Sequence, residues 1–147
     1  MAESQMVWRW GPITRSNAIA ASAILPGDLL EVITAAGVDQ GKVRRHSAAA
    51  GRADPLFADI NWPYGGGLAD AYAAGDSVPT LAPSVGSVIF ARCATGAAIP
   101  EGQVLESAGD GTLRAVTTGV AVGATVETEA ATGDPSPGHI QVRIVAQ

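Results

Sequence analysis

The stretch Gln103-Val-Leu-Glu-Ser-Ala-Gly-Asp-Gly-Thr-Leu-Arg-Ala-Val116 holds two short apolar segments on either side of a tight turn. Its dipeptide Asp110-Gly111 readily accepts the positive φ angles that short hairpin turns require. The stretch therefore predicts a β-hairpin, and with it a C-terminal half built from antiparallel strands.

Strand patterns continue on both sides of this hairpin. Residues 119–127 and 139–145 alternate apolar side chains with others, which is typical of half-buried strands, and residues 86–95 are typical of a buried strand. Strands about ten residues apart with turn residues between them predict a mainly β fold, a small antiparallel β-barrel or sandwich. We expect its core to contain Val88, Phe90, Leu105, Val120, Val122, Val126, Ile140, Val142 and Ile144.

The N-terminal part divides at the turn Pro26-Gly27. Residues 28–34 and 42–47 are predicted to form a hairpin, which begins a β-barrel domain spanning residues 26–147. Residues 1–25 keep neither a helical nor a strand period, so we interpret them as an extended N-terminal arm. A short helix over residues 17–25 would end at Pro26.

Three apolar side chains lie on this arm: Trp8, Trp10 and Ile13. Without a periodicity of their own, they favour contact with the surface of another protein. The alternative is that the segment forms a terminal strand in the domain's own sheet.

Composition and charge exclude several classes of protein. The 147 residues are enough for one domain, and 28 of them are alanine, which contributes little to a core. The net charge of −5 argues against a general nucleic-acid-binding protein. No apolar run approaches the roughly 18 residues of a membrane span, so we expect no membrane partner. One cysteine and two histidines cannot form a thiolate or three-histidine metal site.

The sequence contains no pattern typical of an active site. A phosphate-binding Gly-rich loop followed by Lys is absent, and so is the Gly-x-Ser-x-Gly pattern of a nucleophile elbow. Cys93 lies within a predicted strand and is best explained as a small buried residue. We therefore expect no enzyme activity, no cofactor and no metal.

Basic residues gather in one short region. Residues 1–52 hold six basic and four acidic groups, whereas residues 53–147 hold three basic and ten acidic groups. Lys42, Arg44, Arg45 and Arg52 form the one basic cluster, which we interpret as a docking patch for an acidic partner surface. The alternative is an ordinary solvated strand face.

Five segments, taken in order, resemble capsid decoration proteins of tailed bacteriophages, also called cement or head-stabilising proteins. They are residues 26–32, 41–48, 73–78, 86–92 and 99–114, and the most specific is Leu105-Glu-Ser-Ala-Gly-Asp-Gly-Thr-Leu-Arg114. The similarity covers roughly residues 26–145. The Trp-containing arm and the loop Asn61-Trp-Pro-Tyr-Gly-Gly-Gly67 depart from the family pattern.

The resemblance implies a β-barrel or β-tulip domain that is made in the bacterial host cytoplasm and then binds the outer surface of the virion capsid. Its partners would be the major capsid protein and other copies of itself, commonly as a homotrimer. It would bridge neighbouring capsid subunits and stabilise the shell against internal DNA pressure. The expected capsid contacts are Trp8, Trp10, Ile13, Lys42, Arg44, Arg45 and Arg52.

Two other kinds of function stay open. One is a carrier domain similar to lipoyl or biotinyl domains, with Lys42 as the modified residue. The other is a small carbohydrate-binding or hydrolase domain that uses Asp54, Asp59 and Trp62.

Overall fold

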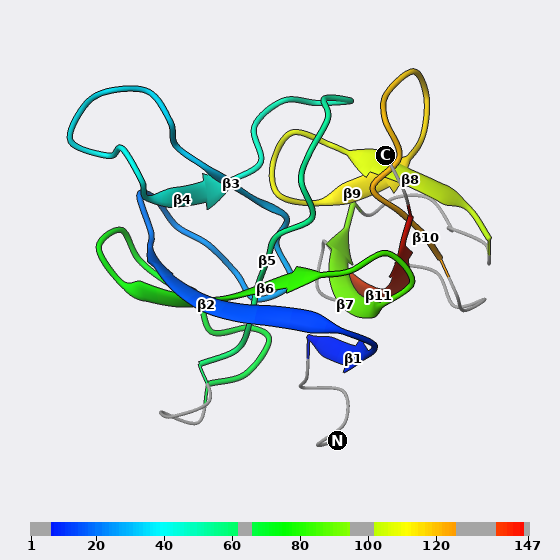
Figure 1. Ribbon diagram of the computed structural model, residues 1–147, viewed down its shortest axis with the longest axis horizontal. Helices are drawn as coiled ribbons and strands as arrows, with labels where there is room; N and C mark the ends of the chain where they lie inside the picture. Colours follow the sequence, from blue (N-terminus) through cyan, green and yellow to red (C-terminus); the bar gives the residue numbers. More distant parts are fainter. Residues whose placement is uncertain (1–6, 62–65, 95–101, 126–137, 146–147) are drawn as a thin grey trace.

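The computed structural model describes residues 7–61, 66–94, 102–125 and 138–145, and this part of the chain contains strands and no helix (Figure 1). The mainly β fold is therefore confirmed. The strands are β1 (Trp8–Trp10), β2 (Ile13–Ile19), β3 (Leu30–Val32), β4 (Val43–Arg45), β5 (Phe57–Ala58), β6 (Ser77–Pro83), β7 (Val88–Cys93), β8 (Val104–Ser107), β9 (Leu113–Ala115), β10 (Gly123–Thr125) and β11 (Gly138–Ile144).

Five strands close into the predicted small barrel. Their order is β7-β11-β10-β8-β9, and a parallel pair between Cys93 and Leu113 joins β9 back to β7. The other pairs around the barrel are antiparallel. The hairpin β8–β9 is the one expected from the sequence, and its turn places Gly111 at φ +86°.

Alternation along the strands fills the barrel. Ile140, Val142 and Ile144 of β11 are buried, as their period of two predicts. Leu105, Val122 and Val88 are buried as well, and Cys93 is fully enclosed. Burial raises the pKa of the Cys93 thiol.

Two of the predicted core residues, Phe90 and Val120, do not belong to the buried core. Phe90 is only half-buried, because Ile89 and Ala91 take the inward face of β7 and Phe90 stacks on His139 at a ring separation of 5.3 Å. Val120 is 38% exposed and precedes β10, because its segment is a loop. Val126 lies outside the described residues.

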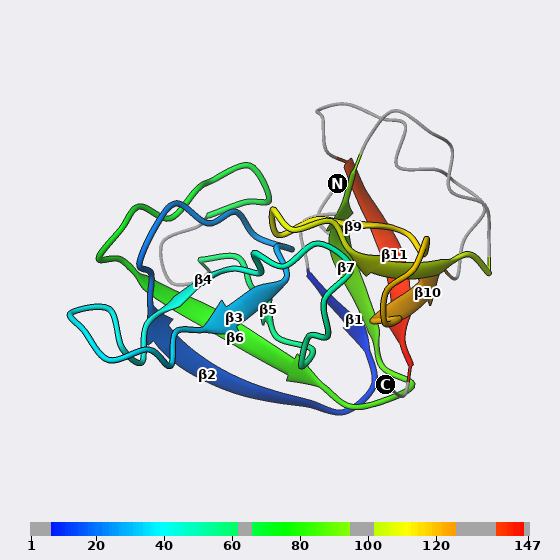
Figure 2. The same cartoon turned by 90° about the horizontal axis from the view of Figure 1, so that it is seen from above.

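A second, smaller unit lies beside the barrel (Figure 2). It consists of the three-stranded sheet β2-β6-β5 and the hairpin β3–β4, whose pairing confirms the predicted N-terminal hairpin. Between them lies a separate apolar cluster: Ala20, Ile24, Leu30, Val43, Ala58, Tyr72 and Val78. Ala18 and Leu56 pack against this cluster.

The predicted arm is corrected by the strand pairing. β1 pairs with β7 of the barrel, and all seven residues of β2 pair with β6, including the start of the segment for which a helix was considered. Val7 is fully buried in the barrel core. In residues 7–25 the chain is therefore part of the domain, as the terminal-strand alternative holds, because β1 and β2 each bond to a neighbouring strand.

Candidate interaction surface

Trp8 is held by the fold. Its indole Nε1 donates a hydrogen bond to the carbonyl of Gly11 over 3.0 Å, and its ring packs against the barrel core. The guanidinium of Arg15 lies 6.0 Å from the ring centroid and also binds the buried carboxylate of Asp59 at 2.7 Å. Ile13 likewise packs against the core. These contacts make Trp8 and Ile13 parts of the domain's own packing.

Trp10 is the exposed member of the three. Its side chain is 57% exposed, although its backbone is fixed opposite Val88. The following turn packs on the β6–β7 connection, where the carbonyl of Pro12 accepts hydrogen bonds from Ser84 N at 3.1 Å and from Ser87 Oγ at 2.7 Å. Both views show the β1–β2 turn beside this connection (Figures 1 and 2).

Val85 lies at the tip of that same connection and is 65% exposed. Together with the exposed Pro12 and Trp10 it forms what we call the apolar corner: Trp10, Pro12 and Val85. Val85 was not among the contact residues predicted from the sequence. The sequence feature that could have indicated Val85 is a large apolar residue in a turn between Pro83 and Gly86, where polar residues are usual.

Most of the predicted basic cluster is neutralised within the domain. Lys42 Nζ pairs with Asp39 Oδ1 at 2.9 Å, and Arg44 Nε pairs with Glu31 Oε1 at 2.7 Å across the β3–β4 hairpin. Lys42 and Arg44 therefore have internal partners, and the solvated-strand alternative describes them better than a free basic patch.

Arg45 and Arg52 differ from one another. Arg45 Nε binds the fully buried carboxylate of Asp28 at 2.7 Å. Within the described part of the chain, Arg52 forms no ion pair, and it is exposed. Arg52 is therefore the cluster member whose charge is available to a partner.

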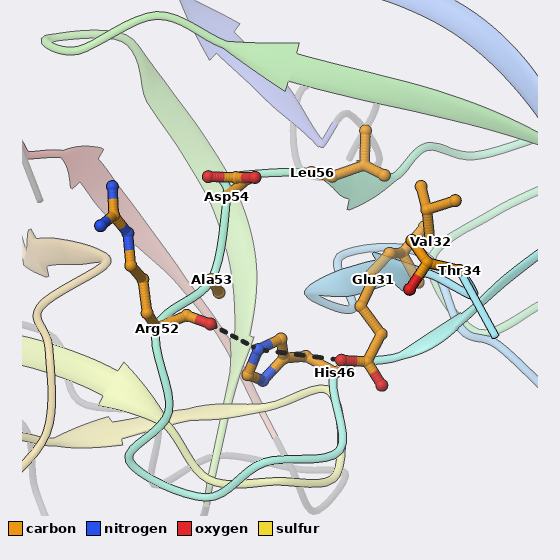
Figure 3. Close-up of a pocket in the computed structure, with 9 residues that line it drawn as sticks. Glu31, Val32, Thr34, His46, Arg52, Ala53, Asp54 and Leu56 are labelled. Carbon is orange, nitrogen blue, oxygen red and sulfur yellow. Dashed lines mark hydrogen bonds and ion pairs between the residues drawn. The ribbon is translucent and has the colours of Figure 1, made fainter.

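A pocket of about 270 Å³ lies between the β3–β4 hairpin and residues 52–56 (Figure 3). The buried His46 lines it, with Nε2 donating to the Arg52 carbonyl at 3.1 Å and Nδ1 bonded to Ser107 Oγ at 2.7 Å. Figure 3 shows the Arg52 side chain extending away from the imidazole ring. Partial burial would raise the pKa of Glu31 at this rim, but hydrogen bonds from Ser47 and Arg44 hold it below its ordinary value.

Arg52 and Asp54 also line a second, more open groove of about 460 Å³. Pro55 follows them in the chain and lines the groove as well. The other walls come from the end of β6, the β6–β7 connection and the end of β11: Pro83, Ser84, Val85, Ile144 and Val145. Val85 belongs both to this groove and to the apolar corner. The corner and the groove thus form one surface, with aliphatic walls and one available arginine.

Of the three residues of the hydrolase alternative, Asp59 has a structural role. The Asp59 carboxylate is buried, accepts a hydrogen bond from Ile60 N at 2.8 Å and binds Arg15. Asp54 is exposed, and Trp62 lies outside the described residues. For the carrier alternative, Lys42 lies where the loop between β3 and β4 joins β4, and its carbonyl accepts a hydrogen bond from Ile33 N at 2.8 Å. A carrier lysine stands at a hairpin tip instead.

Residues 7–61, 66–94, 102–125 and 138–145 contain no group of three or more His, Cys, Asp or Glu side chains that could hold a metal ion. The same residues contain no helix that is long and apolar enough to cross a membrane.

No protein-family model and no curated protein matches the sequence. Among solved structures, the chain is similar to the head fiber gp8.5 N base of bacteriophage phi29. The TM-score is 0.61 at 16% sequence identity, and the match covers 90% of this chain and 94% of that chain. At this identity the similarity shows a shared fold.

Proposed function

We propose that this protein is a structural component of a bacteriophage head that binds the outer surface of the capsid shell. The observation that carries the proposal is the fold shared with a phage head fiber base along nearly the whole of both chains. The resemblance of residues 26–145 to capsid decoration proteins supports it independently, because that resemblance rests on the sequence alone.

The apolar corner is the proposed attachment surface. Trp10 is a large aromatic side chain on a rigid backbone, and such side chains are typical anchors of protein interfaces. Val85 extends the apolar area, and Arg52 offers a positive charge to an acidic shell surface. Trp8, Ile13, Lys42, Arg44 and Arg45 already have partners within the domain, so we assign the attachment to the apolar corner and Arg52.

Attachment to an assembled shell would give the domain a role that needs no catalysis. A molecule that bridges neighbouring major capsid subunits binds the assembled lattice and not its separated parts, so binding stabilises the lattice by linkage. If copies act as a homotrimer, their repeated contacts add avidity. No cofactor, metal or nucleic acid takes part in this function.

A second candidate function follows from the same comparison. The domain serves as the base of a fiber, holding a further structure on the head without strengthening the shell. The shared fold with a head fiber base favours this candidate as much as the first.

Binding to purified expanded heads that lack the protein tests the proposal. Trp10→Ala should weaken co-sedimentation with the heads by about 2 kcal/mol or more, which is roughly 30-fold in Kd. Val38→Ala is the matched control, because Val38 is 92% exposed and lies on the loop between β3 and β4. Equal affinity of the two variants would show that the apolar corner is not the attachment surface.

Salt dependence tests the contribution of Arg52. Exposed ion pairs contribute about 0–1 kcal/mol and are screened by salt. Arg52→Ala should therefore weaken binding modestly and flatten its dependence on salt. Arg44→Ala should leave both unchanged, because Arg44 already pairs with Glu31.

A further inference from the structure

β2 is an edge strand with an unusually open edge. It stands at the end of the sheet β2-β6-β5, and its seven residues follow β6 in an unbroken antiparallel register. It contains no Pro, no Lys and no bulge, which are the devices that usually protect edge strands from pairing with other chains. Figure 2 shows β2 along the rim of the smaller unit.

The other edges among the described residues are protected. β1 has three residues and an irregular register, and β5 has two residues. β3 and β4 have three residues each, and their outer sides bond Leu56 and Ala21. The edge of β5 is also covered, because Ala58 N donates to the carbonyl of Asp28 and the Ala58 carbonyl accepts from Gly27 N. The long open edge of β2 is therefore a specific feature of this chain.

The register identifies which backbone groups of β2 point outward. Ala20 N donates to the carbonyl of Asp76, and the carbonyl of Pro12 accepts from Ser84 N, so the even-numbered residues bond toward β6. Backbone groups alternate direction along a strand, so those of Ile13, Arg15, Asn17 and Ile19 point away from the sheet. Beyond them Ala21 N donates to Val43 of β4, which ends the open edge.

The sequence of this edge, Ile13-Thr-Arg-Ser-Asn-Ala-Ile19, has an isoleucine at each end and Ser16 at its centre. An antiparallel pair of two copies centred on Ser16 places Ile13 opposite the second copy's Ile19. It also places Arg15 opposite the second copy's Asn17. All of these residues carry outward-pointing backbone groups, so the pairing forms hydrogen-bonded pairs and sets no like charges opposite each other.

We propose that two copies of this chain associate through their β2 edges about a two-fold axis at Ser16. The pair joins the two three-stranded sheets into one continuous sheet of six strands. A pair of seven-residue strands is small beside the roughly 1,600 Å² of a standard interface, so the dimer forms reversibly and depends on concentration. This inference does not depend on capsid binding, which uses the apolar corner.

Two substitutions at Asn17 test the register with opposite expectations. Asn17 is exposed and faces Arg15 of the second copy. Although Arg15 binds Asp59, its side chain is still 49% exposed, so Asn17→Glu adds two cross-strand attractions and Asn17→Lys adds two repulsions. Each cross-strand pair contributes roughly 0.2–1 kcal/mol, so the dimer Kd should fall about 2- to 30-fold in the first variant and rise by a similar factor in the second. Sedimentation equilibrium of the full chain over a wide concentration range measures both.

Amide hydrogen exchange provides a second readout on the wild-type protein. The amides of Thr14, Ser16 and Ala18 should be protected at every concentration, because they bond to β6. Those of Arg15, Asn17 and Ile19 should become protected only as the dimer forms. Trp10→Ala is the control, and it should not change self-association even where it abolishes binding to heads.

Three results would overturn the proposal. One is a wild-type chain that stays monomeric at millimolar concentration. Another is a pair of Asn17 variants whose association constants shift in the same direction or not at all. The third is protection of Arg15 and Asn17 amides only when heads are added, which would assign the β2 edge to a strand of the shell.

Discussion

Asp28 and Arg92 form a buried ion pair although they lie 64 residues apart in the sequence. The carboxylate of Asp28 is fully buried and bonds the Arg92 guanidinium of the barrel strand β7. Its second oxygen binds Arg45 of the hairpin β3–β4 and accepts a hydrogen bond from Leu25 N, each at 2.7 Å. This carboxylate therefore joins the barrel to the smaller unit.

Asp28→Asn should destabilise the protein by about 3–5 kcal/mol, because it leaves the buried charge of Arg92 without its counter-charge. Urea unfolding at neutral pH measures the change. Glu31→Gln removes a more exposed pair with Arg44 and should cost about 0–1 kcal/mol. Similar losses in both variants would contradict the role assigned to Asp28.

The carboxyl group of Glu106 is expected to make the stability of the protein depend on pH in the acid range. Burial alone would raise the pKa of its carboxyl, but hydrogen bonds from Thr117, Arg114 and Gly119 N lower it below the ordinary value of 4.5. A lowered folded-state pKa gives stability that is present above pH 4.5 and lost as the pH falls through the folded value. Glu106→Gln should therefore be less stable than wild type at pH 7.

The difference between Glu106→Gln and wild type should narrow as the pH falls below 4.5, because the wild-type carboxyl is then protonated too. Thermal unfolding of both proteins across this range checks it. A stability difference that is the same at every pH would mean that the charge of Glu106 does not matter.

The hydroxyl group of Tyr72 is expected to make the stability of the protein depend on pH in the alkaline range. Burial and the nearby carboxylates of Asp59 and Asp70 raise its pKa from 10.0 to about 12, while its hydroxyl donates to the Asp59 carbonyl at 2.6 Å. A raised folded-state pKa gives stability that is fully present below pH 10 and lost as the pH rises toward 12. Tyr72→Phe should lose about 1–3 kcal/mol at pH 7, since the carbonyl keeps no hydroxyl donor, and should show a shallower alkaline loss. An unchanged alkaline slope would contradict this.

Substitution of Gly111 and Gly41 by alanine compares the effect of steric crowding on stability at two sites with the same φ angle. Both have φ +86°, so alanine strains the backbone equally at either site. A Cβ at Gly111 would lie 2.8 Å from Arg45 Cγ and 3.1 Å from Asp28 Cγ, whereas one at Gly41 meets nothing within 4 Å. Gly41→Ala should cost about 1–2 kcal/mol and Gly111→Ala clearly more, measured by urea unfolding. Equal losses of unfolding free energy in the two variants would show that the turn at Gly111 is not packed tightly against Asp28 and Arg45.

Local patterns in the sequence predicted single strands and turns better than they predicted which strands pair with one another. The alternation of Ile140, Val142 and Ile144 and the turn at Gly111 are properties of single strands and turns, and both predictions are confirmed. The pairing of β1 with β7 joins residues about 80 positions apart, which no periodicity in residues 1–25 records. Val120 alternates like a strand residue, but loop hydrogen bonds to Glu106 hold its segment outside the sheet.

The candidate surface was only partly predictable for the same reason. Trp10 is a conspicuous residue in any sequence, and its contact role remains a prediction. Trp8 and Trp10 would share one face of a regular strand. The register of β1 against β7 is irregular between them, and no local pattern in the sequence records that Trp8 is packed while Trp10 is exposed. The pairing of Lys42, Arg44 and Arg45 with acids depends on the hairpin register and on the burial of Asp28, so the sequence alone suggested a basic patch that is largely neutralised.

We propose that the protein stabilises the shell to which it binds. The most direct test heats DNA-filled heads with and without saturating bound protein and records the temperature at which DNA is released. We predict a higher release temperature for the decorated heads, and a return to the value of bare heads when Trp10→Ala replaces the wild type. Equal release temperatures, with the wild-type protein shown to be bound, would contradict stabilisation and favour the fiber-base function.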